Sequence, residues 1–152
     1  QSWDYCTRDG GLVEERGATY QKWDFVVAAH ETDIRFVCDD AVIVKAEQQP
    51  EDVWNQKCHN QDDPAVSEGP FRFVGEERLR IGDESARAYH YVRSRTLSGG
   101  QTGTERIEAW FDAETGLPLR NVRRIEVKAP TVIGDVSYVE DAEFEATSRH
   151  PV

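Results

Sequence analysis

The chain has 152 residues, a length that suits one domain with a hydrophobic core of its own. Its 29 acidic and 18 basic residues give a net charge of −11 at pH 7, which disfavours nucleic acid and anionic lipid surfaces as partners. Hydrophobic residues make up 38% of the sequence, too large a share for intrinsic disorder. The acidic excess suits a basic partner, or it serves only to keep the protein in solution.

The beginning of the chain indicates a processed protein. Residue 1 is glutamine and the sequence contains no methionine, so we expect a secretion signal, a lipid anchor or a membrane segment upstream. Within residues 1–152 every apolar run is far shorter than the roughly 18 residues that span a bilayer. We therefore predict a single domain over residues 1–152, without a transmembrane segment.

Apolar and polar residues alternate along much of the chain. A pattern of period two predicts strands with one packed face and one wet face, as in an antiparallel sheet. The clearest segments are 23–29, 34–38, 71–73, 79–81, 106–111 and 136–146. No segment shows ten residues of helical periodicity, so we predict little helix.

Turns that contain glycine separate these segments, at Gly10, Gly82, Gly99 and Gly116. Turn signals spaced about every 8–12 residues predict a mostly β domain of roughly eight to ten strands. The polar stretch 59–69 is predicted to be a long loop.

Three cysteines bear on the compartment. Cys38 and Cys58 each end a predicted strand, and these strands are neighbours in sequence, so we predict a disulfide between them. A disulfide favours an oxidising compartment, and therefore an extracytoplasmic protein that is secreted or anchored at the cell surface. Cys6 then pairs outside the chain or stays free. The alternative is three buried thiols in a reducing compartment.

The sequence contains no recognisable catalytic or metal motif. It lacks the Gly-x-Ser-x-Gly elbow of a nucleophilic serine, and its four histidines lie in separate segments. His30 precedes a glutamate, but the second histidine of a zinc protease motif is replaced by Ile34. We therefore predict a non-enzymatic protein without catalytic residues, metal or cofactor. The alternative is a hydrolase that uses loop carboxylates, which requires two carboxylates, or a histidine and a carboxylate, in one cleft.

Aromatic residues are spread over nearly every predicted strand. Tyr89 and Tyr91 share a strand face with arginines, and Trp110 shares a face with Arg106 and Glu108. We predict Tyr89, Tyr91 and Trp110 as ligand-binding residues, because a strongly curved sheet places its pocket on such a face. The alternative is cross-strand packing with cation–π pairs on a wet face.

Residues 108–120 have the sequence EAWFDAETGLPLR. This segment resembles the W-F-D-x-x-T-G-L-P-L-R hairpin of bacterial envelope domains of the LolA, LppX and RseB group, and the second half also resembles uncharacterised secreted proteins of actinobacteria. The resemblance implies a single strongly curved antiparallel sheet, or half-barrel. It also implies a binding domain for a hydrophobic small molecule or lipid, or alternatively a protein-interaction or sensor module of the cell envelope. The helices that cover the concave face in that group are not visible in the first half of this sequence.

Overall fold

The computed structural model describes residues 2–24, 29–131 and 134–149, and every regular element in them is a β-strand. Nine strands form one antiparallel sheet in which each strand pairs with the next along the chain. Their bounds are β1 Ser2–Arg8, β2 Gly11–Asp24, β3 Ala29–Val44, β4 Val53–Asn60, β5 Val66–Ile81, β6 Glu84–Ser98, β7 Thr102–Asp112, β8 Pro118–Thr131 and β9 Gly134–Glu145. None of the described residues forms a helix that could cross a membrane.

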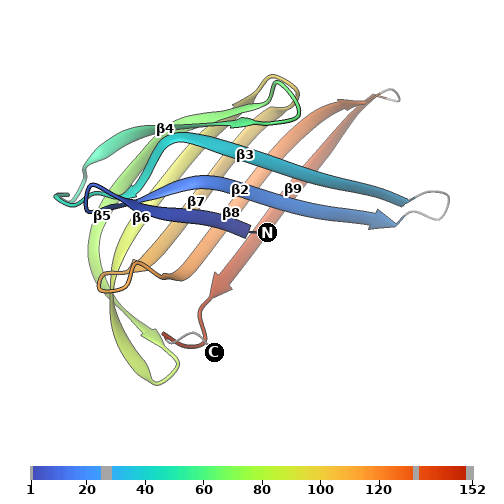
Figure 1. Ribbon diagram of the computed structural model, residues 1–152. Coiled ribbons are helices and arrows are strands. Elements are labelled where there is room, and N and C mark those ends of the chain that lie inside the picture. Colours follow the sequence, from blue (N-terminus) through green and yellow to red (C-terminus); the bar gives the residue numbers. More distant parts are fainter. Residues whose placement is uncertain (1, 25–28, 132–133, 150–152) are drawn as a thin grey trace.

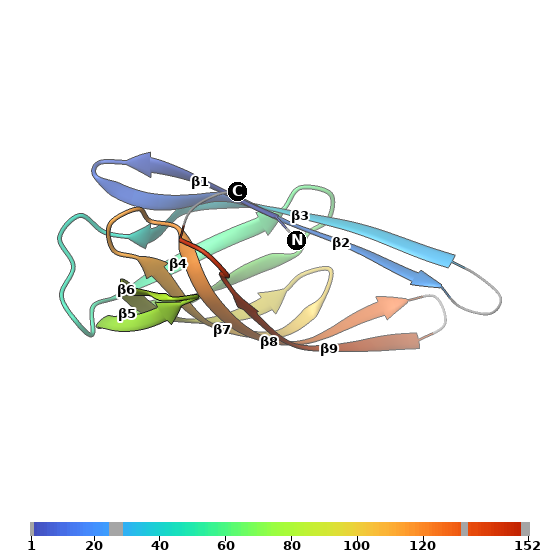
Figure 2. The same cartoon turned by 90° about the horizontal axis from the view of Figure 1, so that it is seen from below.

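The sheet curls into a half-barrel, which confirms the predicted fold class. Among the described strands, the two edges of the sheet, β1 and β9, do not pair with each other. Strands β1–β3 turn back across the concave face of strands β5–β9 (Figure 1). Viewed from below, they form a second layer over that face (Figure 2). Register shifts in the ladders, such as the one between Phe73 and Gly75, increase the local twist that this curling requires.

The main core lies between these two layers and is rich in aromatic rings. Tyr91 is fully buried, and the ring centroids of Phe71, Phe73 and Phe111 lie 5.1, 5.2 and 6.0 Å from its own. The buried members of the cluster are Ile43, Phe71, Phe73, Tyr91, Ile107, Ala109 and Phe111. Because alternate residues of a strand face opposite sides, the odd-numbered positions of β6 and β7 point into this core.

A second, smaller cluster lies on the convex face near the β5–β6 turn. It consists of Ile81, Ala86, Ala88, Trp110 and Leu119, and Ala146 packs against it. The backbone N–H of Ala146 donates to the carbonyl of Leu119 at 2.8 Å, which fastens the segment after β9 to this cluster.

Cys38 and Cys58 face each other across the β3–β4 ladder and form a disulfide, as predicted. The ladder between these two strands has only four paired positions, so the covalent bond reinforces a short junction. Cys6 on β1 is a free, partly exposed thiol. Its sulfur donates to a carboxylate oxygen of Glu15 at 3.2 Å, and this hydrogen bond raises the pKa of the thiol.

The prediction of a long loop over residues 59–69 is wrong, because β4 continues to Asn60 and β5 begins at Val66. Side chains close the short turn that remains. Asn60 donates to Asp63 at 2.9 Å, and Asp63 accepts from the backbone N–H of Ala65 at 2.6 Å. Polar residues that look like a loop in sequence therefore form a compact turn. The alternation predicted over residues 23–29 falls mostly outside the described residues.

The EAWFDAETGLPLR segment forms the predicted hairpin between β7 and β8. Local contacts explain several of its residues. One carboxylate oxygen of Asp112 accepts from the backbone N–H groups of Glu114 and Thr115, at 2.8 and 3.0 Å. The other accepts from Arg149 Nε at 2.8 Å. Gly116 adopts a φ of +73°, in the left-handed region that favours glycine.

Candidate functional site

The three predicted ligand-binding aromatics do not gather in one place. Tyr89 and Tyr91 pair with Phe111 and Ala109 in the β6–β7 ladder and lie on the concave face. Trp110 pairs with His90 and lies on the convex face. The sheet itself separates the two tyrosines from the tryptophan, so one ligand cannot contact all three in this conformation.

Tyr91 is packed as a core residue. It is 0% exposed, and its hydroxyl accepts a hydrogen bond from Gln48 Nε2 at 2.8 Å. Burial raises the pKa of Tyr91, so its phenol stays neutral. Tyr89 is partly buried and packs edge-on against Phe73, with ring centroids 5.7 Å apart. These contacts are those of the packing alternative, and a ligand role for either tyrosine stays a prediction.

Trp110 is held on the convex face by three neighbours. The imidazole of His90 stacks on its ring with centroids 4.3 Å apart, and the Arg120 guanidinium lies 5.0 Å from the ring centroid. The indole N–H donates to a carboxylate oxygen of Glu77. His90 Nδ1 is 3.2 Å from Glu77 Oε1, and His90 Nε2 is 3.6 Å from Glu108 Oε2. A histidine and two carboxylates therefore meet on this face.

These groups are the kinds that the hydrolase alternative requires, but Glu77 and Glu108 already have structural partners, and His90 Nε2 is buried without a hydrogen-bond partner among the described residues. The indole N–H of Trp110 donates to Glu77, and its ring covers one face of the His90 imidazole. Arg106 Nη2 lies 2.9 Å from Glu108 Oε1. The side chain of His90 is only 18% exposed. A general base must reach a substrate proton. The arrangement is better suited to cross-strand packing than to proton transfer.

A chain of buried charges crosses the concave interior beside the aromatic core. Arg93 places Nη1 3.0 Å from Glu14 Oε2 and Nη2 3.1 Å from Glu105 Oε2. Arg123 continues the chain, with Nε 3.5 Å from Glu105 Oε1 and Nη1 3.5 Å from Glu140 Oε1. The five side chains come from β2, β6, β7, β8 and β9, so the network links the covering layer to the sheet beneath it.

The central members of this network keep their charges despite their burial. Burial by itself would lower the pKa of Arg93, but the carboxylates of Glu105 and Glu14 raise that pKa above its usual value. Burial would likewise raise the pKa of Glu105, but Arg93 and Arg123 hold it below its usual value. Removal of one partner from such a network leaves an uncompensated buried charge, which is strongly destabilising.

Arg95, two residues further along the same face, makes no ion pair with any described residue, and burial outweighs the attraction of Glu14 and Glu105. It is 5% exposed, and its Nη2 donates to Gln56 Oε1 at 2.6 Å. Its Nε has no hydrogen-bond partner among the described residues. Burial, together with repulsion from Arg93, lowers the pKa of Arg95 to about 10. This guanidinium is held by an amide instead of a carboxylate.

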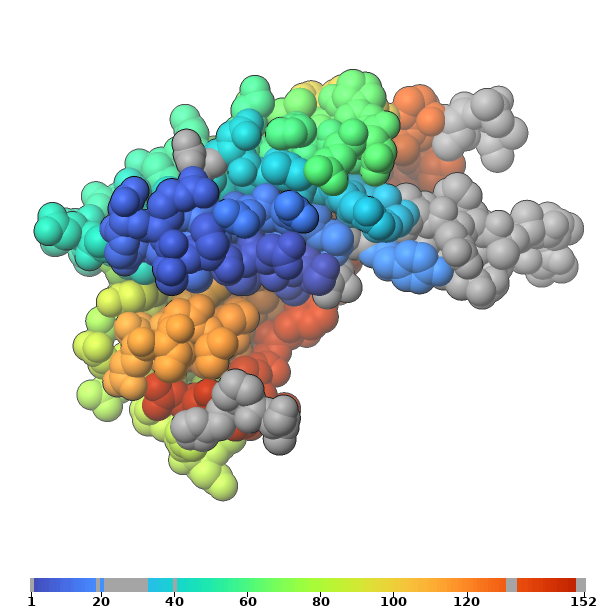
Figure 3. Space-filling model, in the orientation of Figure 1, coloured from blue at the N-terminus to red at the C-terminus, as the bar shows by residue number. Residues whose placement is uncertain are grey.

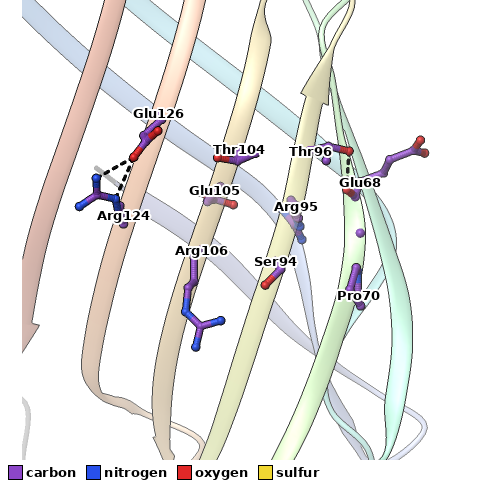
Figure 4. Close-up of a pocket in the computed structure, with 11 residues that line it drawn as sticks. Glu68, Pro70, Ser94, Arg95, Thr96, Thr104, Glu105, Arg106, Arg124 and Glu126 are labelled. Atoms are coloured by element: carbon purple, nitrogen blue, oxygen red, sulfur yellow. Dashed lines mark hydrogen bonds and ion pairs between the residues drawn. The ribbon is translucent and has the colours of Figure 1, made fainter.

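A shallow hollow of about 370 Å³ lies on the convex face over strands β5–β8. Its lining residues are mostly polar or charged, but the surface that they turn toward the hollow comes mainly from apolar atoms; Figure 4 shows these side chains on adjacent strands. They include Ser94, Thr96, Thr104, Arg106, Arg124 and Glu126. Arg124 lies 2.7 Å from Glu126, and Arg106 is paired with Glu108. The hollow is therefore shallow and mixed in character, and its lining favours neither a polar nor a hydrophobic ligand.

Exposed apolar side chains concentrate on the edge strand β9. Val136, Val139 and Phe144 are 50%, 59% and 49% exposed. Val136 and Phe144 pair with Ala129 and Asn121 of β8, and they lie on the concave side of the sheet. The alternation of residues 136–146 predicts a packed face here, yet the structure leaves much of it open. Strands β1 and β2 cover the middle of the molecule (Figure 3), and among the described strands β9 has a neighbour on one side only.

No protein-family model, curated protein or solved structure matches this chain. Among the described residues, no group of three His, Cys, Asp or Glu side chains could hold a metal ion. The resemblance to envelope half-barrel domains therefore stays a prediction.

The sequence pattern alone does not predict the buried charge network or the open face of β9. One signal for the network is visible, because Arg93 and Arg95 continue the same strand face as the buried Tyr91. Charges on an otherwise apolar face indicate either a wet face or internal ion pairs. No sequence rule identifies Glu14 as a partner, since it lies 79 residues from Arg93.

Proposed function

We propose that this chain is a non-enzymatic, extracytoplasmic binding domain, and that it binds a protein at the apolar side of its edge strand β9. One observation carries the proposal. The concave side of β9 is apolar apart from Glu140, which lies 3.5 Å from Arg123, and its Val136 and Phe144 are 50% and 49% exposed. Open apolar patches on folded domains mark interaction sites.

The disulfide supports the compartment. Cys38–Cys58 is a cross-strand bond of the kind that persists in oxidising environments. The hairpin motif of residues 108–120 supports the finer assignment to an envelope half-barrel domain, secreted or anchored at the surface. The half-barrel form agrees with that assignment, although its concave face is covered by strands β1–β3 in place of helices.

A protein ligand is favoured over a hydrophobic small molecule or lipid because the concave interior is occupied. Tyr91, Phe71 and Phe73 are 0%, 2% and 4% exposed and fill the space between the two layers. The buried charge network lies beside them. A lipid would need apolar lining that faces free volume, whereas the open apolar groups of this chain lie along a strand edge that an extended peptide can follow.

The test is selection of random dodecapeptides on the immobilised, disulfide-bonded protein. We expect the selected peptides to bind the parent at least about tenfold more tightly than a Val136→Ser/Phe144→Ser variant. Val53→Ser is the matched control, because Val53 is 57% exposed but lies on β4. Its variant should bind like the parent. Circular dichroism and thermal unfolding establish that all variants are folded.

Three outcomes would overturn the proposal. The first is that no peptide is selected, and the second is that selected peptides bind the β9 variant as well as the parent. The third comes from native mass spectrometry of protein purified from its own envelope extract without detergent. A reproducible lipid-sized added mass, lost in the β9 variant, would assign this face to a lipid.

A further inference from the structure

The free edge of β9 is a template for another strand. The ladder between β8 and β9 runs from the pair Arg120 and Glu145 to the pair Thr131 and Gly134. None of the described strands lies on the other side of β9. An edge strand directs the N–H and C=O groups of alternate residues away from its neighbour, where an extended segment of another chain can bond to them. The edge is twelve residues long, which exceeds a typical strand of about five or six residues.

The two faces of β9 differ in chemistry. Its concave side carries Val136, Tyr138, Ala142 and Phe144, together with Glu140, which lies 3.5 Å from Arg123. Its convex side carries four carboxylates, from Asp135, Asp141, Glu143 and Glu145. With Glu140 included, Gly134–Glu145 contains five acidic residues and no lysine or arginine. A segment added beside this strand meets mostly apolar groups on the concave face, and mostly negative charge, with Ser137 and Val139 among it, on the convex face.

Only part of this charge is neutralised from within the sheet. Arg124 lies 3.2 Å from Asp141, and Arg120 lies 2.6 Å from Glu143. Asp135 and Glu145 are exposed and make no ion pair with any residue that the structure describes. The outer row of carboxylates therefore has capacity for positive charge from a neighbouring strand.

We propose that β9 receives an extended basic segment of a partner protein, in which apolar residues alternate with lysine or arginine. The apolar residues extend the concave face beside Val136 and Phe144, and the basic residues lie opposite the convex carboxylates. The inference rests on the proposed function and adds to it the chemistry of the partner. Backbone hydrogen bonds provide the pairing, and the two faces provide its specificity.

A second copy of this chain is a poor occupant of the same edge. Antiparallel pairing of β9 with another β9 places carboxylates opposite carboxylates, which is unfavourable. Strand β1, the other edge, carries one acidic and one basic residue, Asp4 and Arg8, and so offers no net positive charge. The whole chain is strongly acidic, with a net charge of −11. Charge complementarity therefore favours a basic partner.

The experiment compares three synthetic nonapeptides by fluorescence anisotropy. The first alternates lysine or arginine with valine or phenylalanine, the second has the same composition in an order without alternation, and the third has glutamate in place of each basic residue. We expect the first to bind at least about tenfold more tightly than the other two. A Glu143→Gln/Glu145→Gln variant should bind it several-fold more weakly, and the difference should shrink at high salt. Hydrogen exchange should show new protection in β9.

The outcomes separate this inference from the proposed function. If the alternating peptide fails to bind while library-selected peptides still depend on Val136 and Phe144, the basic-strand partner is wrong and the binding face stands. If the selected peptides do not depend on β9 either, both proposals fail. Equal binding of the alternating and reordered peptides, or binding without protection in β9, would show general attraction to an acidic protein and would overturn the inference.

Discussion

Arg93 of β6 donates a hydrogen bond to Glu14 of β2 across the interior of the half-barrel, with 3.0 Å between Nη1 and Oε2. The two side chains are 9% and 5% exposed. This bond joins the strand layer that covers the concave face to the sheet below it. Apolar contacts are tolerant of small shifts, whereas a buried ion pair fixes one position of the partners. The pair therefore helps to define how far β2 lies over the sheet.

Replacement of Glu14 by glutamine tests the importance of this bond. We expect Glu14→Gln to lower the free energy of unfolding by about 3 kcal/mol, because the charge of Arg93 then has Glu105 as its only close carboxylate. Urea denaturation measures the change. Glu15→Gln is the control, since the neighbouring side chain is 47% exposed and should contribute less than about 0.5 kcal/mol. Similar losses for both variants would contradict a special role of the buried pair.

Arg93 and Arg95 lie on the same strand face. Removal of their charges should change the free energy of unfolding in different ways. Arg93→Met removes the ion-pair partner of buried Glu14 and leaves Glu105 with Arg123 alone, and it should cost about 3 kcal/mol. Arg95→Met removes a guanidinium whose pKa burial lowers to about 10, and it should be neutral or stabilise by about 1 kcal/mol. Equilibrium unfolding of both variants at pH 7 provides the comparison. A large loss for Arg95→Met would show that Arg95 has a compensating partner.

The stability of the protein should fall in acid through Glu105. Arg93 and Arg123 hold the pKa of Glu105 below its unfolded value of about 4.3, so the folded state binds fewer protons there than the unfolded state. The contribution is fully present above about pH 5 and is lost as the pH falls through the folded pKa. Unfolding measured between neutral and acidic pH should show this decline, and Glu105→Gln should flatten it. Glu126→Gln, on the exposed convex face, should leave the slope unchanged.

The sequence predicts the sheet well because strand formation is a local matter. The alternation in 106–111 and the glycines at positions 82, 99 and 116 determine strand faces and turns without reference to the rest of the chain. The Cys38–Cys58 disulfide can also be predicted from the sequence, because the two strands that carry these cysteines are neighbours in sequence and pair directly.

Contacts between the two layers could not be predicted in this way. Tyr91 and Trp110 are both aromatic residues next to charges in sequence, but their faces depend on how β6 and β7 are aligned in the ladder. Burial of Tyr91 further depends on strands β1–β3 turning back over the sheet, which no residue pattern specifies. The open face of β9 has the same origin. Its alternation matches that of a packed strand, and only the overall shape leaves it uncovered.

Gly116 tests whether the β7–β8 turn depends on local backbone conformation. Its φ of +73° lies in a region that branched side chains rarely adopt, so Gly116→Val should lower the free energy of unfolding by more than about 1 kcal/mol. The added Cβ would meet only Leu12 Cδ2, at 4.0 Å, so the cost comes from the backbone and not from a clash. Gly116→Asn should cost less, because asparagine tolerates this conformation. Thermal unfolding of the two variants distinguishes the cases. Equal melting temperatures for valine and glycine would mean that residue 116 does not need a positive φ, and the turn geometry assigned to the β7–β8 hairpin would then be incorrect.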